Sequence, residues 1–210
     1  MKQKWLFWGI PLVALILGIW LALNLAAPSN PQHLSSYPQP RKLAEVELVN
    51  AQGDTVKPGQ WLEGQWTLAF TGYTYCPDIC PTTMAALNRI YEQLQQLPSD
   101  QPIRVLFVSV DPKRDTPERL AEYGAFFNSE FQAVTGPHKE LFPFVRSLGM
   151  MYAMSQSTDD NDYLVDHSGS VVLLNPKAQV VGRFKPESRP GQLAVVNPNH
   201  ILADMPVLVD

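Results

Sequence analysis

The sequence predicts an α/β domain that follows a single N-terminal transmembrane helix. Two observations predict this arrangement. The residues from Leu6 to Ala27 carry no charge and, as a helix, are long enough to cross the hydrocarbon core of a bilayer. After them, short apolar runs typical of buried strands alternate with stretches whose apolar residues recur at the three-and-four spacing of an amphipathic helix.

The flanking charges orient the predicted membrane helix, residues 6–27. Lys2 and Lys4 precede it and the next charge is Arg41, so the positive-inside rule places residues 1–5 in the cytoplasm and the remaining chain across the membrane. A cleaved signal peptide is the alternative, but such a peptide has a shorter apolar stretch and a better small-residue cleavage site. No Arg-rich and Ser-rich leader precedes the helix, so we expect a bacterial inner membrane with the domain on the periplasmic side.

The rest of the chain divides into a tether and one domain. Residues 28–42 are rich in Pro and Ser and lack an apolar period, which predicts an extended tether. Residues 43–210 then form the domain, since a chain of 210 residues with 45% apolar content is long enough for one core. A net charge of −4 and the expected location both argue against nucleic-acid binding.

The predicted strands are apolar runs bounded by turn residues. Residues 45–50 precede a Gly-Asp turn signal, and residues 65–73 hold an apolar and aromatic run. Residues 103–110 are mostly apolar and β-branched, which is typical of a central strand covered on both faces. Further strands are expected at 150–155 and, around a turn, within 170–184.

The predicted helices have one apolar face each. Residues 84–97 show the helical spacing and are followed by Pro98. Asp115 or Thr116 caps the next helix, which has Pro117 in its first turn. Shorter helices are expected at 138–148 and within 199–205. A strand, a Cys-containing turn, a helix, a second strand and helix, and a hairpin is the order found in thioredoxin-like folds.

The only two cysteines, Cys76 and Cys80, are the candidate reactive residues. Both lie in the exported part, where a thiol pair can be oxidised to a disulfide. That disulfide would close a very short loop and stabilise the fold little, which favours a functional role over a structural one. Because Pro81 suits the first turn of a helix, we expect Cys80 near the helix N-terminus, where the dipole favours its thiolate.

Two thiolates favour a soft metal. They select Cu(I), zinc or an iron–sulfur cluster over hard cations, and structural zinc sites and clusters usually need more cysteines than this chain has. A third ligand for Cu(I) would be a His or a Met. Spacing alone does not choose among the four histidines, which are His33, His138, His167 and His200.

Several segments occur in an informative order along the chain: GYTYCPDICPTTM, VSVDPKRDTPERLAEY, TG and YLVDHSGSVVLLNP. Together they closely resemble the Sco/SenC family of membrane-anchored copper chaperones for cytochrome oxidase. The family motif is Cys-Pro-x-x-Cys-Pro after an apolar strand, and the family histidine lies in a Val-Asp-His-Ser segment. The resemblance covers roughly half of the chain, from Gly72 to Pro176.

Carried over residue by residue, the resemblance implies that Cys76, Cys80 and His167 are copper ligands. Tyr75 stands where many relatives carry a His, and Tyr73 where many carry a Phe. The helper His beside the first Cys is therefore missing, while the ligand set is intact. Both tyrosines are expected to wall the site or to dock a partner.

The resemblance implies a copper metallochaperone. It would deliver copper to the binuclear site of cytochrome c oxidase subunit II, with a thiol reductant or a copper donor protein as a further partner. The alternative is an enzyme, a thiol–disulfide reductase that acts on oxidase or other exported cysteines. Sensing of copper or of redox state is a third reading, and the sequence leaves Cu(I) against Cu(II) and the role of His200 open.

Other residues near these motifs have ordinary structural interpretations. Asp111 and Asp115 fit turn and cap chemistry, with metal or partner contacts as the alternative. The methionines of the 150–155 stretch fit a strand that packs its side chains better than they fit copper ligands. Asp166 either orients His167 as a hydrogen-bond acceptor or turns the chain.

Overall fold

The computed structural model describes residues 11, 13–20, 30–154, 158, 162–188, 190–191 and 193–209. It divides into two compact units, residues 1–30 and residues 31–210. In the first unit, residue 11 and residues 13–20 are helical and exposed. No helix within the described residues has the length and apolar character that a membrane crossing requires. More than half of the predicted span, 6–27, lies outside the described residues.

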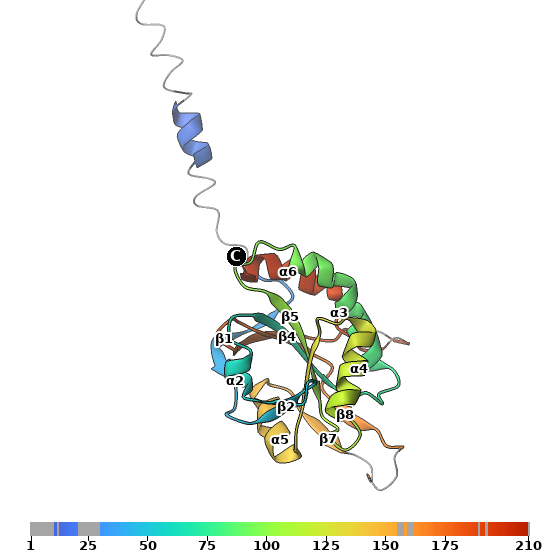
Figure 1. The fold of residues 1–210 in the computed structure, drawn as a ribbon. Helices are drawn as coiled ribbons and strands as arrows, with labels where there is room; N and C mark the ends of the chain where they lie inside the picture. Colours follow the sequence, from blue (N-terminus) through green and yellow to red (C-terminus); the bar gives the residue numbers. More distant parts are fainter. Residues whose placement is uncertain are drawn as a thin grey trace, which may run out of the picture. The chain divides into compact units, whose positions relative to one another are not determined.

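The second unit is built on an eight-stranded sheet with the strand order β1-β10-β9-β4-β5-β6-β2-β3 (Figure 1). Its strands are β1 (Ser35–Lys42), β2 (Leu48–Asn50), β3 (Thr55–Val56), β4 (Trp66–Gly72), β5 (Ile103–Ser109), β6 (Gln132–Thr135), β9 (Val171–Leu174) and β10 (Gln179–Phe184). A second sheet pairs β7 (Tyr152–Met154) with β8 (Val165–His167). The helices are α2 (Pro58–Trp61), α3 (Ile79–Gln95), α4 (Pro117–Phe127), α5 (His138–Ser147) and α6 (Pro198–Val209).

The centre of the large sheet is parallel. β4 pairs with β5 from Trp66↔Ile103 to Gly72↔Ser109, and β5 pairs in parallel with β6. Almost every residue of β4 and β5 is buried, because helices cover both faces of the sheet. The predicted buried strands and the α/β class are confirmed.

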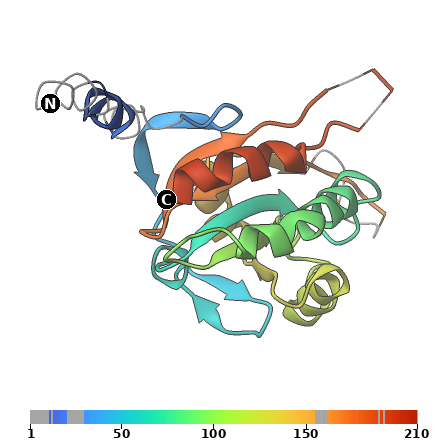
Figure 2. The ribbon, with the colours of Figure 1, turned by 90° about the horizontal axis from the view of Figure 1, so that it is seen from above.

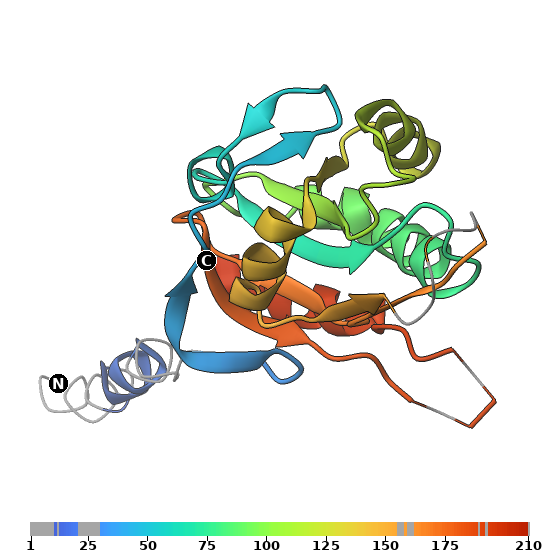
Figure 3. The ribbon, with the colours of Figure 1, turned by 90° about the horizontal axis from the view of Figure 1, so that it is seen from below.

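The helices lie on both faces of this sheet. α3 and α4 connect successive parallel strands, and right-handed crossovers place both on the same face. α6 packs beside α3 (Figure 2), while α5 lies on the opposite face (Figure 3). The carboxyl ends of β4 and β5 therefore meet the start of α3 and α4 at one edge of the domain. That edge is where ligand sites of open α/β sheets form.

The helix starts follow the predicted chemistry. The Thr116 side chain accepts the Arg119 N–H, and Pro117 is the first residue of α4. α3 begins at Ile79, earlier than the predicted 84–97, so that Cys80 and Pro81 lie inside its first turn.

The tether predicted over 28–42 is corrected by the structure. Ser35–Lys42 is β1, an edge strand antiparallel to β10, with an irregularity between Ser36 and Arg41. The prolines that argued against a strand are tolerated there, because an edge strand has one side without ladder partners. The Asp204 carboxylate of α6 also accepts the backbone N–H groups of Gln32, His33 and Leu34 at 2.7–2.9 Å, which ties this segment to the domain.

Candidate metal centre

The two cysteines lie at the connection between β4 and α3. Cys76 is half-buried in the connecting loop, and its N–H donates to the Tyr73 carbonyl at 3.2 Å. Cys80 is the second residue of α3 and is fully buried. Asp78 occupies the N-cap position without a side-chain capping bond. The Cys76 Sγ instead accepts the Cys80 N–H at 3.4 Å, so this sulfur satisfies a free donor of the first turn.

His167 reaches the same place from the second sheet. It is the last residue of β8, opposite Tyr152 of β7. Its Nδ1 donates to the Ser168 carbonyl at 3.3 Å, because a carbonyl oxygen can only accept. Nε2, the other ring nitrogen, lies 3.4 Å from the Cys80 Sγ and is the nitrogen placed to bind a metal. The orienting acceptor is this carbonyl, the role that the sequence suggested for Asp166.

The ligand atoms of Cys76, Cys80 and His167 all lie within 4.8 Å of one another. An ion bound in their plane at bond lengths of about 2.3 Å to sulfur and about 2.0 Å to imidazole nitrogen would separate them by roughly 3.7 to 4.0 Å. The folded chain thus holds the three predicted residues close to the spacing of a three-coordinate metal site. Two soft sulfurs and an imidazole nitrogen suit copper.

The two sulfurs differ in protonation. A hydrogen bond from the Cys80 thiol, which outweighs the effect of burial, lowers the pKa of Cys76 to about 3. Burial, followed by the neighbouring Cys76 sulfur, raises the pKa of Cys80. At neutral pH the pair therefore holds one thiolate, on Cys76, and one thiol, on Cys80.

The expectation that the helix dipole favours a Cys80 thiolate is wrong. Cys80 is already inside α3, where its side chain points into the core and away from water. The sulfur that faces the unpaired N–H end of the helix belongs to Cys76, four residues earlier. The N-terminus of α3 thus favours a thiolate as predicted, but the thiolate is on Cys76 and not on Cys80.

Aromatic rings form the walls of the site. Phe70 and Tyr73 each place an edge-to-face ring 6.0 Å from the His167 ring, centroid to centroid. Burial raises the pKa of Tyr73, so this wall stays neutral. Tyr75 is 54% exposed beside the site. A shallow cavity of about 230 Å³, lined by Cys76, His167, Leu164, Leu193 and others, gives access to the ligands.

The other histidines lie elsewhere. His138 Nδ1 is 2.9 Å from the Tyr152 hydroxyl, and His33 stacks on His200 with ring centroids 3.7 Å apart. His200 also lies 3.2 Å from the Glu187 carboxylate. A larger cavity of about 710 Å³, between residues 42–47 and 177–179, has no His or Cys in its lining, so it does not compete as a soft-metal site.

The methionine stretch is partly a packing strand, as predicted. Met150 is buried with its sulfur 3.7 Å from the Thr71 hydroxyl oxygen, and Met154 packs against the core. Met151 is 71% exposed, so the packing interpretation is wrong for this residue. None of the three lines the cavity of about 230 Å³ beside the ligand residues.

Arg114 and Tyr163 contact the loops that support the site, and neither of them was singled out from the sequence. Arg114 stacks its guanidinium on the Tyr163 ring, 3.6 Å from the centroid, and its Nη2 donates to the Tyr163 carbonyl at 3.0 Å. The signal was a cation between Asp111 and Asp115 directly after a central strand, the position where open α/β sheets carry functional residues.

Comparisons with known proteins agree with this geometry. The family model described as SCO1/SenC matches residues 36–197. A SCO2-like protein of Rickettsia typhi is 31% identical over 179 residues, which are 83% of this chain and 87% of that protein. The mitochondrial SCO2 homolog of Bos taurus is 34% identical over 167 residues, which are 76% of this chain. The match covers 60% of the bovine protein, so the chain spans less than two thirds of that relative's length.

A solved structure has the same fold. The crystal structure of Arabidopsis thaliana ScoI with copper bound superposes with a TM-score of 0.65 and 27% sequence identity, over 79% of this chain and 97% of that chain. The similarity confirms the thioredoxin-like α/β fold, and the family model confirms the family that the sequence segments resemble.

Gly72 fits closely against the buried cysteine. A Cβ at this position would lie 2.7 Å from the Cys80 Sγ and 2.8 Å from the Phe107 ring. We expect Gly72→Ala to displace the sulfur and to lower the free energy of unfolding by roughly 1 to 3 kcal/mol. Urea unfolding of the reduced chain measures this loss. Gly59→Ala is the matched control, because a Cβ there meets nothing within 4 Å. Equal stability of the two variants would contradict the close fit.

The unequal sulfurs predict one thiolate per reduced chain across neutral pH. We expect the ultraviolet thiolate absorbance of the purified chain to stay constant between about pH 5 and pH 8, where an ordinary cysteine of pKa about 8.5 is protonated. It should fall as the pH approaches about 3, the pKa of Cys76. Cys76→Ser should lack this absorbance, whereas Cys80→Ser should retain one thiolate. A signal that grows only above about pH 8 would contradict the assignment.

Proposed function

The chain belongs to the SCO1/SenC family, and on this basis we propose that it is a copper metallochaperone whose ligands are Cys76, Cys80 and His167. The convergence of these three ligand atoms within 4.8 Å is the observation that supports the proposal most. The copper-bound state of the similar Arabidopsis structure supports the choice of metal. Copper is the cargo of this site.

The protonation states suggest how copper is loaded. Cys76 is ready to bind as a thiolate, so loading at neutral pH requires the loss of only one proton, from Cys80. A Cys76–Cys80 disulfide has no thiolate to offer. Copper loading therefore depends on prior reduction, and a thiol reductant or a copper donor protein is the expected upstream partner.

We propose the binuclear copper site of cytochrome c oxidase subunit II as the destination of the copper. The support is the family and the access to the site. Cys76 and His167 are only half-buried and open into the shallow cavity, so an acceptor's ligands can approach them. Cys80 is fully buried and would be the last ligand to release the ion.

We also propose that residues 6–27 anchor the domain to a bacterial inner membrane, on its periplasmic side. The uncharged apolar stretch and the preceding Lys2 and Lys4 support this orientation. In intact cells, a thiol reagent that crosses only the outer membrane should label reduced Cys76. Labelling that requires cell lysis would contradict the orientation.

A second candidate function is thiol–disulfide reduction. Cys76 is a partly accessible thiolate, which is the profile of an attacking cysteine. It would attack a substrate disulfide and form a mixed disulfide with release of a substrate thiol. Cys80, after losing its proton, would then displace the second thiol and leave a Cys76–Cys80 disulfide.

His167 separates the two functions. We expect His167→Ala to weaken Cu(I) binding by at least about tenfold, a loss of about 1.4 kcal/mol, because it removes one of three ligands. The measurement is competition with a chromogenic Cu(I) chelator, using the reduced 210-residue chain. His138→Ala is the matched control, since His138 contacts Tyr152 and lies outside the ligand group.

The rate of disulfide exchange should stay within about twofold in the same His167→Ala variant, because exchange uses only the two sulfurs. If copper delivery is the function, oxidase assembly in cells should be lost in His167→Ala together with copper binding. Unchanged copper affinity in His167→Ala would reject the proposed ligand set. Normal oxidase assembly by a variant that no longer binds copper would favour the reductase.

A further inference from the structure

A buried charged cluster lies on the loop between β5 and α4, beside the ligand residues. It consists of Asp111, Arg114 and Asp115, and we call it the aspartate–arginine cluster. Both carboxylates are fully buried, and the Arg114 side chain is 7% exposed. A buried charge is unfavourable unless it is paired and hydrogen-bonded. The partners of these three side chains therefore indicate what the cluster holds in place.

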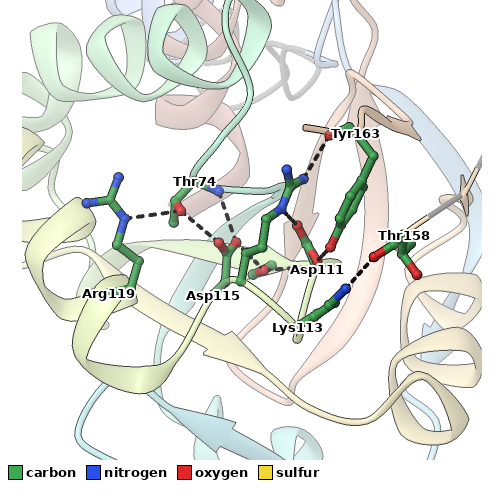
Figure 4. A network of polar contacts seen from close by, with 9 residues as sticks. Thr74, Asp111, Lys113, Asp115, Arg119, Thr158 and Tyr163 are labelled. Carbon is green, nitrogen blue, oxygen red and sulfur yellow. Dashed lines mark hydrogen bonds and ion pairs between the residues drawn. The ribbon is translucent and has the colours of Figure 1, made fainter. Parts of the chain in front are cut away.

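Asp115 holds the cysteine loop. Its carboxylate accepts the Thr74 backbone N–H at 2.9 Å and the Thr74 hydroxyl at 2.7 Å. It also accepts the Ser109 hydroxyl at 2.6 Å, at the end of the central strand β5. Thr74 lies two residues before Cys76, and Figure 4 shows it directly above Asp115. This arrangement fixes the cysteine loop to the rigid centre of the sheet.

Asp111 and Arg114 hold the segment that leads to the histidine. The Tyr163 hydroxyl donates to Asp111 at 2.5 Å (Figure 4), and the Arg114 Nη2 donates to the Tyr163 carbonyl at 3.0 Å. The Arg114 Nε pairs with the Asp111 carboxylate. Tyr163 is buried and lies four residues before His167. The segment is thus held by its side chain and by its backbone.

A single guanidinium faces both halves of the site. Arg114 lies over the Tyr163 ring on the histidine side. On the cysteine side it lies 5.4 Å from the Tyr73 ring centroid and 4.9 Å from that of Tyr75. These tyrosines flank Thr74, and a guanidinium within about 6 Å of a ring face is attracted to it. Arg114 therefore connects the loop of Cys76 to the segment of His167.

The position of His167 needs such a connection. β8 pairs with β7 in the small sheet and does not join the eight-stranded sheet that carries the cysteine loop. Directly after His167, the Thr71 hydroxyl of β4 donates to the Ser168 carbonyl at 3.0 Å and so connects this part of the chain to the large sheet. The aspartate–arginine cluster makes the corresponding connection before His167, through Tyr163.

We propose that Asp111, Arg114 and Asp115 are positioning residues that set the distance between His167 and the two cysteine sulfurs, and thereby the copper affinity of the site. The effect on copper rests on the proposed function, whereas the effect on the geometry of the metal-free site does not. A purely structural role would change the stability of the chain without a specific dependence on His167.

The first test is a double-mutant cycle between Arg114 and His167. Arg114→Lys keeps a charge beside Asp111 but loses the planar fork and the stack. We expect it to weaken Cu(I) binding by roughly 10- to 100-fold, the range seen when a residue that orients a metal ligand is lost. In His167→Ala, where there is no ring to position, Arg114→Lys should add less than about twofold. If the double variant loses Cu(I) affinity by the product of the two single-variant losses, the two residues act independently and the proposal is overturned.

Arg104→Lys is the matched control. It makes the same substitution near the opposite end of β5, where Arg104 pairs with Glu130 and Tyr91. Its Cu(I) affinity should equal that of the wild-type chain. If Arg104→Lys weakens copper binding as much as Arg114→Lys does, the effect is general and the proposal is wrong.

The second test needs no copper. In the reduced metal-free chain, the Phe70 and Tyr73 rings around His167 should shift the NMR signals of its ring protons. Arg114→Lys should move these signals toward those of a free imidazole, and Arg104→Lys should not. Unmoved signals in Arg114→Lys would overturn the positioning role. If the signals move but the wild-type chain binds no copper, the proposed function fails and the positioning role stands.

Tyr163→Phe provides an independent variant in case Arg114→Lys does not fold. It removes only the hydroxyl that donates to Asp111 and leaves the ring available for stacking. We expect Cu(I) binding about tenfold weaker and the same direction of change in the His167 signals. Wild-type affinity and wild-type signals in Tyr163→Phe would reject the proposal.

Discussion

The 3.4 Å contact between the Cys80 Sγ and the His167 Nε2 is the constraint on which the site depends. Cys80 lies in α3 and His167 lies in β8 of the small sheet, and the two residues are 87 positions apart in the sequence. Each is fixed by its own surroundings: Cys80 by burial in α3, and His167 by β8 and by the hydrogen bond of its Nδ1 to the Ser168 carbonyl. Because both are fixed before metal arrives, little ordering is needed on binding.

Burial and the contact between the two sulfurs explain why Cys76 and Cys80 differ in protonation. In the metal-free chain the buried Cys80 stays a thiol, since an isolated buried thiolate would be strongly unfavourable. Cys76 remains at the surface of the helix end and carries the negative charge. One cysteine therefore supplies a rigid position and the other an accessible thiolate. The proposed function, in which the site binds copper and then releases it, would use both properties.

The sequence predicted correctly those elements that depend mainly on their own local residues. The strands of the parallel centre, the Thr116 cap and the approximate place of Cys80 follow from apolar runs and prolines. β1 was missed because its prolines are tolerated only at an edge, which depends on the tertiary neighbours. His167 was found by family resemblance, since sequence spacing does not show which segments meet. The contacts of Arg114 likewise depend on Tyr163, a residue distant in sequence.

X-ray absorption at the copper edge of the Cu(I)-loaded, reduced chain tests the central claim most directly. The geometry of Cys76, Cys80 and His167 predicts one copper per chain with two sulfur neighbours and one nitrogen neighbour. In the His167→Ala variant the nitrogen should disappear while both sulfurs remain. A wild-type spectrum with sulfur neighbours alone, or a nitrogen that persists in His167→Ala, would contradict the account.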